Sequence, residues 1–238
     1  MPKETVDTAV IVRHYEEANQ GCPHCSFERE ADAYEIDRLL DGNMMIECIR
    51  METDARGFCA DHYAKLVNAR SRFSVAVMLE SHLHELQNVY LEKNNPKKGK
   101  GSLGSKMAGL DADCYICRRM SGHMENFEAG VAVLWKRRQD FRELFGKNGR
   151  LCIHHYARQL AACEKELDNN TYRDMSEAMY QNVRKTLDRL ADEAKFYVSR
   201  FDYRVTGADK NFGTSADVLE RVGEFLHGEQ PKGGHLKK

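Results

Sequence analysis

The chain contains one cysteine–histidine motif twice, and this repeat constrains the fold more than any other feature of the sequence. Each copy begins with Cys-x-x-Cys, continues through a long spacer, and ends with an apolar residue followed by Cys-x-x-His-Tyr-Ala and a basic residue. The spacers, residues 26–58 and 118–151, differ in length by a single residue. Because the order, the spacing and the flanking residues all recur, we interpret the chain as an internal duplication.

The repeated cysteines and histidines are candidate metal ligands. Zinc prefers four tetrahedral ligands drawn from thiolate and imidazole, and two ligands separated by two residues can wrap one face of the ion. We therefore predict two zinc ions per chain, one for each half of the sequence. Four protein ligands leave no open position, so we expect closed structural sites rather than hydrolytic ones. The predicted sets are Cys22, Cys25, Cys59 and His62 for the first ion, and Cys114, Cys117, Cys152 and His155 for the second.

These cysteines have three other interpretations. Paired but unmetallated thiols would not require two sets in the same order. Thioredoxin-like redox chemistry at Cys-x-x-Cys normally occurs in a βαβ context, which this sequence lacks. Iron–sulfur clusters usually take four cysteines, so a histidine in each set favours zinc, and iron stays the main rival.

The remaining cysteines and the neighbouring histidines have no counterpart in the other half. His24 corresponds to Ile116, and His154 corresponds to Asp61, so we expect neither histidine to be a ligand. Cys48 and Cys163 also fail to recur, and we expect both to be buried as small apolar residues.

Two further features are open to a functional or a structural interpretation. Tyr63 and Tyr156 directly follow the ligand histidines, where they can orient the imidazoles or pack between helices. Residues 201–204, Phe-Asp-Tyr-Arg, form either a docking surface or the ion-paired end of a helix. We favour the structural interpretation of both.

Helical periodicity runs through most of the chain, and no segment shows the alternation of a strand. The first half predicts helices over residues 27–40 and 44–52, then a long amphipathic run after His62. The second half repeats this plan, and a last helix is predicted over residues 216–227, capped by Thr214 or Ser215 and ended by Gly228. The apolar positions that carry the periodicity include Leu66, Phe73, Val77, Leu83, Phe127, Val131, Leu134, Trp135, Phe141, Phe145, Met175, Met179, Val183 and Leu190.

These patterns predict an all-α protein made of duplicated helical metal-binding modules with a C-terminal helix. We expect a first repeat over residues 1–94 and a second over residues 113–204. Residues 95–112, rich in glycine, serine and lysine, are expected to be a flexible linker. Residues 205–238 are expected to contain a loop, the last helix and a polar tail.

Composition excludes some function classes. The formal net charge is −1, which gives no global electrostatic case for nucleic acid or an anionic membrane. No segment approaches the roughly 18 apolar residues of a membrane span, and the N-terminus lacks the apolar region of a signal peptide. We therefore expect a cytoplasmic protein, in which the eight cysteines are tested for metal ligation before disulfides.

The duplicated Cys-Pro-x-Cys and Phe-Cys-x-x-His-Tyr pattern, together with residues 201–204 and a terminal helix, resembles an uncharacterised bacterial family known only as a domain of unknown function. The resemblance covers nearly the whole chain and rests on the eight candidate ligands. It implies an all-helical, cysteine-rich bacterial protein and brings no activity.

The sequence leaves several functions open. Closed metal sites, with no evident nucleophile–base arrangement, favour a non-enzymatic interaction or scaffold protein with a protein partner. A zinc-thiolate redox or metal sensor, or an iron-binding protein, is the first alternative. A ligand-binding protein or enzyme with a pocket between the repeats is the next, although glycine-rich phosphate loops and paired-carboxylate signatures are missing. The neutral charge makes nucleic acid an unlikely partner.

Overall fold

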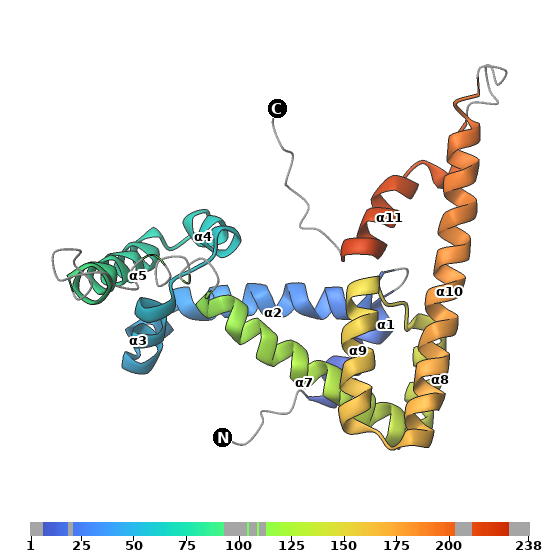
Figure 1. The fold of residues 1–238 in the computed structure, drawn as a ribbon, viewed down its shortest axis with the longest axis horizontal. Coiled ribbons are helices and arrows are strands. Elements are labelled where there is room, and N and C mark those ends of the chain that lie inside the picture. Colours follow the sequence, from blue (N-terminus) through green and yellow to red (C-terminus); the bar gives the residue numbers. More distant parts are fainter. Residues whose placement is uncertain are drawn as a thin grey trace. The chain divides into compact units, whose positions relative to one another are not determined.

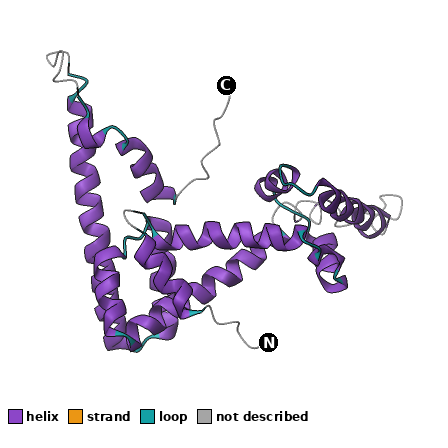
Figure 2. Cartoon of the chain, turned by 180° about the vertical axis from the view of Figure 1, so that it is seen from behind, coloured by secondary structure: helices purple, strands orange, loops and turns teal. Residues whose placement is uncertain are grey.

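The computed structural model describes residues 7–18, 21–92, 104, 109, 113–202 and 211–228. These residues form helices, turns and loops and contain no strand (Figure 2). The predicted all-α class is therefore confirmed. Within the described part of the chain, no helix has both the length and the apolar character needed to cross a membrane.

Figure 1 shows the order of the helices along the chain. Their bounds are α1 Thr8–Glu17, α2 Pro23–Leu40, η1 Asn43–Met45, α3 Glu47–Arg56, α4 Ala60–Val67, α5 Arg72–Glu85, the π-helical η2 Leu86–Glu92, α7 Tyr115–Arg137, α8 Gln139–Asn148, α9 Ile153–Glu166, α10 Asn169–Ser199, η5 Gly213–Ser215 and α11 Val218–His227.

The chain forms two compact units, and their boundaries fall inside two of its helices. Unit 1 contains Met1–Phe27 and Met124–Lys238, and unit 2 contains Glu28–His123. Helix α2 thus begins in unit 1 and continues in unit 2, whereas α7 begins in unit 2 and continues in unit 1. The two compact units are a different division of the chain from the two sequence repeats, residues 1–94 and 113–204. The predicted linker, apart from Gly104 and Gly109, and the tail after Gly228 lie outside the described residues.

One core of unit 1 is built from aromatic side chains of α1, α7 and α8. Tyr15 is fully buried, with its ring stacked on Phe145 at 5.4 Å and edge-on to Phe141 at 5.1 Å. Helix α1 approaches α7 closely at Gly130, where a β-carbon would lie 2.5 Å from Ile11 Cδ1. The predicted apolar stripe of this region is confirmed, since the side chains that form it are buried: Phe127, Val131, Leu134, Trp135, Phe141 and Phe145.

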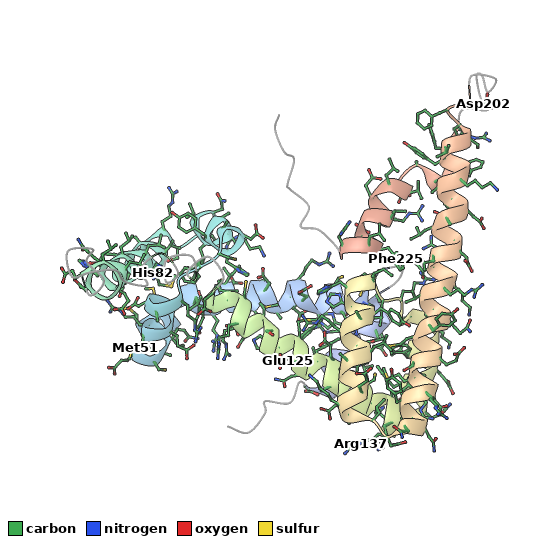
Figure 3. The ribbon with its side chains drawn as sticks, viewed as in Figure 1. Met51, His82, Glu125, Arg137, Asp202 and Phe225 are labelled. Atoms are coloured by element: carbon green, nitrogen blue, oxygen red, sulfur yellow. The ribbon has the colours of Figure 1, made fainter. Side chains whose placement is uncertain are left out.

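A separate hydrophobic cluster of unit 1, the α10–α11 cluster, joins α10 to α11. Val183 and Leu190 of α10 pack with Val218 and Phe225 of α11, and Phe225 is marked on α11 in Figure 3. The predicted last helix is confirmed to within two residues, and Gly228 ends it with a φ of 84°, a conformation that favours glycine. The predicted cap is wrong, because Thr214 and Ser215 lie in η5 and Asp217 occupies the N-cap position.

Unit 2 packs α3 and α4 against α5. Ser81 of α5 donates a hydrogen bond to Asp54 of α3, and His82 Nδ1 lies 2.6 Å from the Asp54 carbonyl oxygen. Figure 3 shows His82 on α5 and Met51 on α3. The run after His62 is not one long helix, because residues 68–71 separate α4 from α5.

The burial predicted for this run is also partly wrong. Leu66 is buried, but Phe73 is 74% exposed and Leu83 is 63% exposed. Helix α5 carries apolar residues around most of its circumference, so periodicity alone did not identify the buried face. The buried face of α5, which packs inside unit 2, carries Val75 and Met78 instead.

Candidate metal centres

Four side chains of unit 1 form the first cluster. Cys22 directly precedes α2 and Cys25 lies in its first turn. Cys152 is the N-cap residue of α9, and His155 lies one turn further on. Each of the four offers one ligand atom, and these atoms all lie within 4.8 Å of one another.

The second cluster repeats this design within unit 2. Cys59 is the N-cap residue of α4 and His62 lies in its first turn. Cys114 directly precedes α7, and Cys117 lies in the first turn of that helix. Their four ligand atoms also lie within 4.8 Å of one another.

Each cluster is assembled from the N-termini of two helices, α2 and α9 for the first cluster and α4 and α7 for the second. Residues three apart on a helix share a face, so Cys-x-x-Cys and Cys-x-x-His each point two ligand atoms in one direction. A thiolate is also favoured at a helix N-terminus, where unpaired backbone N–H groups carry partial positive charge. The backbone N–H of His155 donates to Cys152 Sγ at 3.5 Å in this way.

The structure brings all eight predicted residues into clusters, but the predicted grouping is wrong. Each Cys-x-x-Cys meets the Cys-x-x-His of the other half. The first cluster is Cys22, Cys25, Cys152 and His155, and the second is Cys59, His62, Cys114 and Cys117.

Helix length explains the exchange. The 18 residues of α2 span roughly 27 Å, and the 10 residues of α3 span only about 15 Å. The spacer of one half therefore cannot bring its Cys-x-x-His back to its own Cys-x-x-Cys. The same holds for α7, whose 23 residues span roughly 35 Å and are followed by the 10 residues of α8.

Distances within the first cluster centre on the imidazole. His155 Nδ1 lies 3.2 Å from Cys152 Sγ, 3.3 Å from Cys25 Sγ and 3.8 Å from Cys22 Sγ. The sulfurs of Cys25 and Cys152 are 3.7 Å apart.

The second cluster has nearly the same dimensions. His62 Nδ1 lies 3.1 Å from Cys59 Sγ, 3.3 Å from Cys117 Sγ and 3.4 Å from Cys114 Sγ. The sulfurs of Cys59 and Cys117 are 3.7 Å apart.

These separations match the edges of a tetrahedron around one ion. Zinc–sulfur bonds of about 2.3 Å and zinc–nitrogen bonds of about 2.05 Å give edges of roughly 3.8 Å between sulfurs and 3.6 Å between sulfur and nitrogen. A disulfide would hold two sulfurs at about 2.05 Å. The four residues of each cluster therefore fit one metal ion held by three thiolates and one imidazole.

A carboxylate orients the histidine of the second cluster. Asp32 Oδ1 lies 2.7 Å from His62 Nε2, and Lys65 donates to Asp32 Oδ2 at 2.6 Å. Burial lowers the pKa of His62, but hydrogen bonds to Asp32 and the thiols outweigh it and raise that pKa to about 10. With Nε2–H donated to Asp32, Nδ1 faces the thiols, which is the arrangement of a carboxylate–histidine–metal triad.

Sequence reasoning missed Asp32, and the repeat offered no signal for it. The equivalent position in the second half is Met124. In the first cluster an aromatic neighbour lies beside the ligand histidine instead, because the ring of His24 is 5.4 Å from that of His155. Burial lowers the pKa of His24 well below its usual value, and His24 Nε2 lies 3.0 Å from the hydroxyl oxygen of Tyr15. As predicted, His24 is outside the cluster.

The two clusters differ in exposure. In the first, Cys22, Cys25, Cys152 and His155 are all buried. Helix α11 ends against this cluster, since a β-carbon at Gly228 would lie 3.6 Å from Cys25 Sγ. In the second, His62 and Cys114 are buried, Cys59 is partly exposed and Cys117 is exposed.

The other cysteines lie outside both clusters, as predicted. Cys163 is fully buried, and its Sγ lies 3.3 Å from Met175 Sδ. Cys48 is exposed on α3, so the prediction that it is buried was wrong.

The repeated tyrosines also differ from one another. Tyr156 packs against the α10–α11 cluster, which confirms the packing interpretation. Tyr63 is 47% exposed, so it is not packed into a buried hydrophobic cluster as Tyr156 is. In the Phe-Asp-Tyr-Arg segment, Phe201 is exposed with its ring 5.4 Å from that of Tyr197, and Tyr203 and Arg204 lie outside the described residues.

A cavity of about 700 Å³ lies beside the first cluster, within unit 1. Cys22 and Cys152 form part of its wall. Its polar side carries Glu193 of α10, which pairs with Arg189 at 3.0 Å and with Arg221 of α11. Its apolar lining is made by Leu151, Leu190 and Phe225.

Comparison with known proteins gives a family and no activity. The model of DUF6062, described as a family of unknown function, matches residues 2–233. The chain therefore belongs to this family, as its motifs indicated. No curated protein and no solved structure matches it.

Proposed function

We propose that each cluster binds one zinc ion as a closed structural site. The observation that carries this proposal is the set of four ligand atoms at near-tetrahedral separations, found twice in the chain. Three thiolates and an imidazole are soft and borderline ligands that suit zinc, and they fill its four positions. Iron is the alternative metal for such a set.

Elemental analysis of the purified protein tests the metal. We expect close to two equivalents of zinc per chain and a colourless protein, because zinc has a filled d shell. A brown protein that contains iron and acid-labile sulfide would overturn the assignment.

We further propose that the zinc-stapled helices form a non-enzymatic interaction protein of the cytoplasm, with a protein as its partner. Unit 2 supports the proposal of a protein partner, because several of its helices carry large apolar side chains that are exposed to solvent. Phe73 and Leu83 are the most exposed of these on α5, and Met51 on α3 is 65% exposed. A shallow groove of about 330 Å³ runs along α5 beside Ala76, Leu79 and Leu83. Exposed apolar surface of this kind is typical of protein interaction sites.

Affinity purification with a double variant tests this function. Phe73→Ser with Leu83→Ser should abolish the capture of a specific protein that the wild type retains from its native extract. Tyr34→Ser is the matched control, because Tyr34 is a 59% exposed side chain of the same unit that lies on α2 and not on α5. Equal capture by wild type and the double variant would contradict the use of this surface.

The cavity beside the first cluster favours ligand binding as a second candidate function. Its volume lies in the range of small-molecule sites, and it combines an apolar lining with paired charges. Ala216 lines it, so Ala216→Trp should fill it. A small molecule that raises the melting temperature of wild type but not of Ala216→Trp, at equal zinc content, would establish this function. If no compound of a metabolite library raises the wild-type value, the candidate fails.

A further inference from the structure

The two clusters are a matched pair that differs in one property. Each contains two sulfurs from different helix N-termini at 3.7 Å, Cys25 with Cys152 in the first and Cys59 with Cys117 in the second. Each imidazole lies within 3.8 Å of its three thiols. The first pair of sulfurs is buried, with Cys25 3% and Cys152 2% exposed, whereas Cys117 is exposed and Cys59 partly exposed.

We propose that the second cluster is a redox modification site, at which hydrogen peroxide oxidises Cys59 and Cys117 to a disulfide and the zinc ion is released. The inference rests on the proposed zinc binding. The first cluster keeps its ion under the same conditions and maintains the fold of unit 1.

Access is the first step of the argument. Oxidation of a thiolate by a peroxide requires the oxidant to reach the sulfur, so susceptibility follows exposure as well as thiolate character. Zinc holds all three cysteines of each cluster as thiolates, which makes the two sites alike in charge. Exposure therefore decides between them, and it places Cys117 first among the six ligand sulfurs.

The chemistry balances with the peroxide as the named oxidant. The Cys117 thiolate attacks one peroxide oxygen, the O–O bond breaks, and a sulfenic acid and hydroxide form. The Cys59 thiolate then attacks the Cys117 sulfur, the S–S bond forms, and a second hydroxide leaves. Two electrons pass from the two sulfurs to the peroxide, and two protons from solvent convert the hydroxides to water.

Geometry favours Cys59 as the resolving thiol. Its sulfur has to approach Cys117 from 3.7 Å to about 2.05 Å. Cys59 is the N-cap residue of α4, and Cys117 lies in the first turn of α7. Cys114 also neighbours Cys117 but is buried at 4% exposure. Once Cys59 and Cys117 are joined, only Cys114 and His62 remain as ligands, which is too few for a stable zinc site.

Zinc release from the full-length protein tests the inference. Hydrogen peroxide is added in small excess, and a chromogenic chelator reports free zinc. We expect one equivalent to be released per chain, followed by a plateau, with a Cys59–Cys117 disulfide found by peptide mapping after alkylation. Thiol reductant and added zinc should restore the second equivalent. Release of both ions at one rate, release of neither, or a Cys114–Cys117 disulfide would overturn the proposal.

Two variants isolate the clusters. Cys25→Ser should keep one zinc in the second cluster, and Cys117→Ser should keep one in the first. We expect peroxide to release zinc from Cys25→Ser about tenfold or more faster than from Cys117→Ser, since exposure of the remaining thiols differs. Cys48→Ser is the control for an exposed cysteine outside the clusters and should behave as wild type. A wild-type protein that holds no zinc before peroxide is added would refute zinc binding itself, whereas equal release rates would refute only the redox site.

Discussion

The carboxylate of Asp32 holds the imidazole of His62, with Oδ1 2.7 Å from Nε2, and thereby turns Nδ1 toward three thiols. Carboxylates in this position fix the tautomer of a metal-binding histidine and raise its basicity. Asp32→Ala should therefore weaken zinc binding at the second cluster by roughly 10- to 100-fold and leave the first cluster unchanged. Competition with a chelator of known affinity measures both constants.

Asp37→Asn is the control for this change, because Asp37 is an exposed carboxylate on the same helix. If Asp37→Asn weakened zinc binding as much as Asp32→Ala, a general charge effect would explain the loss. If Asp32→Ala bound both ions as tightly as wild type, Asp32 would have no role at the site.

Gly57 ends α3 two residues before Cys59, with a φ of 65°. A β-carbon there would lie 2.6 Å from the His82 ring, and the Gly57 carbonyl accepts a hydrogen bond from the backbone N–H of Tyr115, next to Cys114. Gly57→Ala should therefore lower the melting temperature and cost the second zinc ion more than the first, because it displaces both helix starts of that cluster. Calorimetry and metal analysis measure the two effects.

Gly42→Ala separates backbone strain from displacement of the site. Gly42 has a φ of 110° but no atom within 4 Å of an added β-carbon. The Gly42→Ala variant should have a lower melting temperature than wild type and should still bind both zinc ions. Equal zinc loss in the two variants would argue that any destabilisation of unit 2 empties the second cluster.

The repeat in the sequence was sufficient to find the eight residues of the two clusters but not to group them. Recurrence selected four pairs of equivalent residues, such as Cys22 with Cys114, and rejected His24 and Cys163, because duplicated chemistry requires duplicated ligands. The grouping depends on where a helix carries the chain. Since α2 is far longer than α3, a Cys-x-x-Cys cannot be closed by the spacer that follows it.

Features that belong to only one half of the sequence cannot be identified by comparing the two halves. Asp32 supports one histidine and has no counterpart, so neither repeat nor spacing indicated it. Cys48 and Phe73 were expected to be buried because they are apolar, but their helices place them in solvent. Burial depends on which face a neighbouring helix covers, and the periodicity of a helix with apolar residues on several faces does not specify that.

Glu35 is a fully buried carboxylate of α2 that lies next to two guanidinium groups and one imidazole. His123 Nε2 lies 2.6 Å from it, Arg38 3.1 Å and Arg119 3.5 Å. Glu35→Gln should lower the free energy of unfolding by about 1–3 kcal/mol at pH 7, because the amide lacks the negative charge that pairs with the two guanidinium groups. Urea unfolding of the zinc-loaded protein measures this loss. A change below about 0.5 kcal/mol would show that the ion pairs of Glu35 contribute little to the stability of the fold.

The pH dependence of this contribution follows from its sign. Burial raises the pKa of Glu35, but the hydrogen bond with His123 and the charges of Arg119 and Arg38 outweigh it and leave that pKa below its usual value. A depressed carboxyl pKa stabilises the fold above the unfolded value of about 4.3 and loses that effect as pH falls through the folded value. The part of the difference between wild type and Glu35→Gln that comes from the carboxylate charge should therefore shrink as the pH falls below about 4.3.

Removal of both ions should loosen the helix starts without unfolding every helix. The aromatic core around Tyr15 and the α10–α11 cluster contain no ligand residue, so they keep their packing when the thiols are free. Strong chelation under reducing conditions should lower the melting temperature and preserve much of the far-UV helical signal. A melting temperature unchanged by chelation would contradict a structural role for the metal.

Double variants distinguish the observed grouping of ligands from a grouping by sequence halves. Cys59→Ser with Cys114→Ser removes two ligands of one cluster, so about one zinc equivalent should be lost. Cys22→Ser with Cys59→Ser removes one ligand from each cluster, so about two equivalents should be lost. Grouping by halves would give the opposite result for both pairs. Zinc analysis of the two purified variants, with Cys48→Ser with Cys163→Ser as a pair that should lose none, therefore decides which helix starts share an ion.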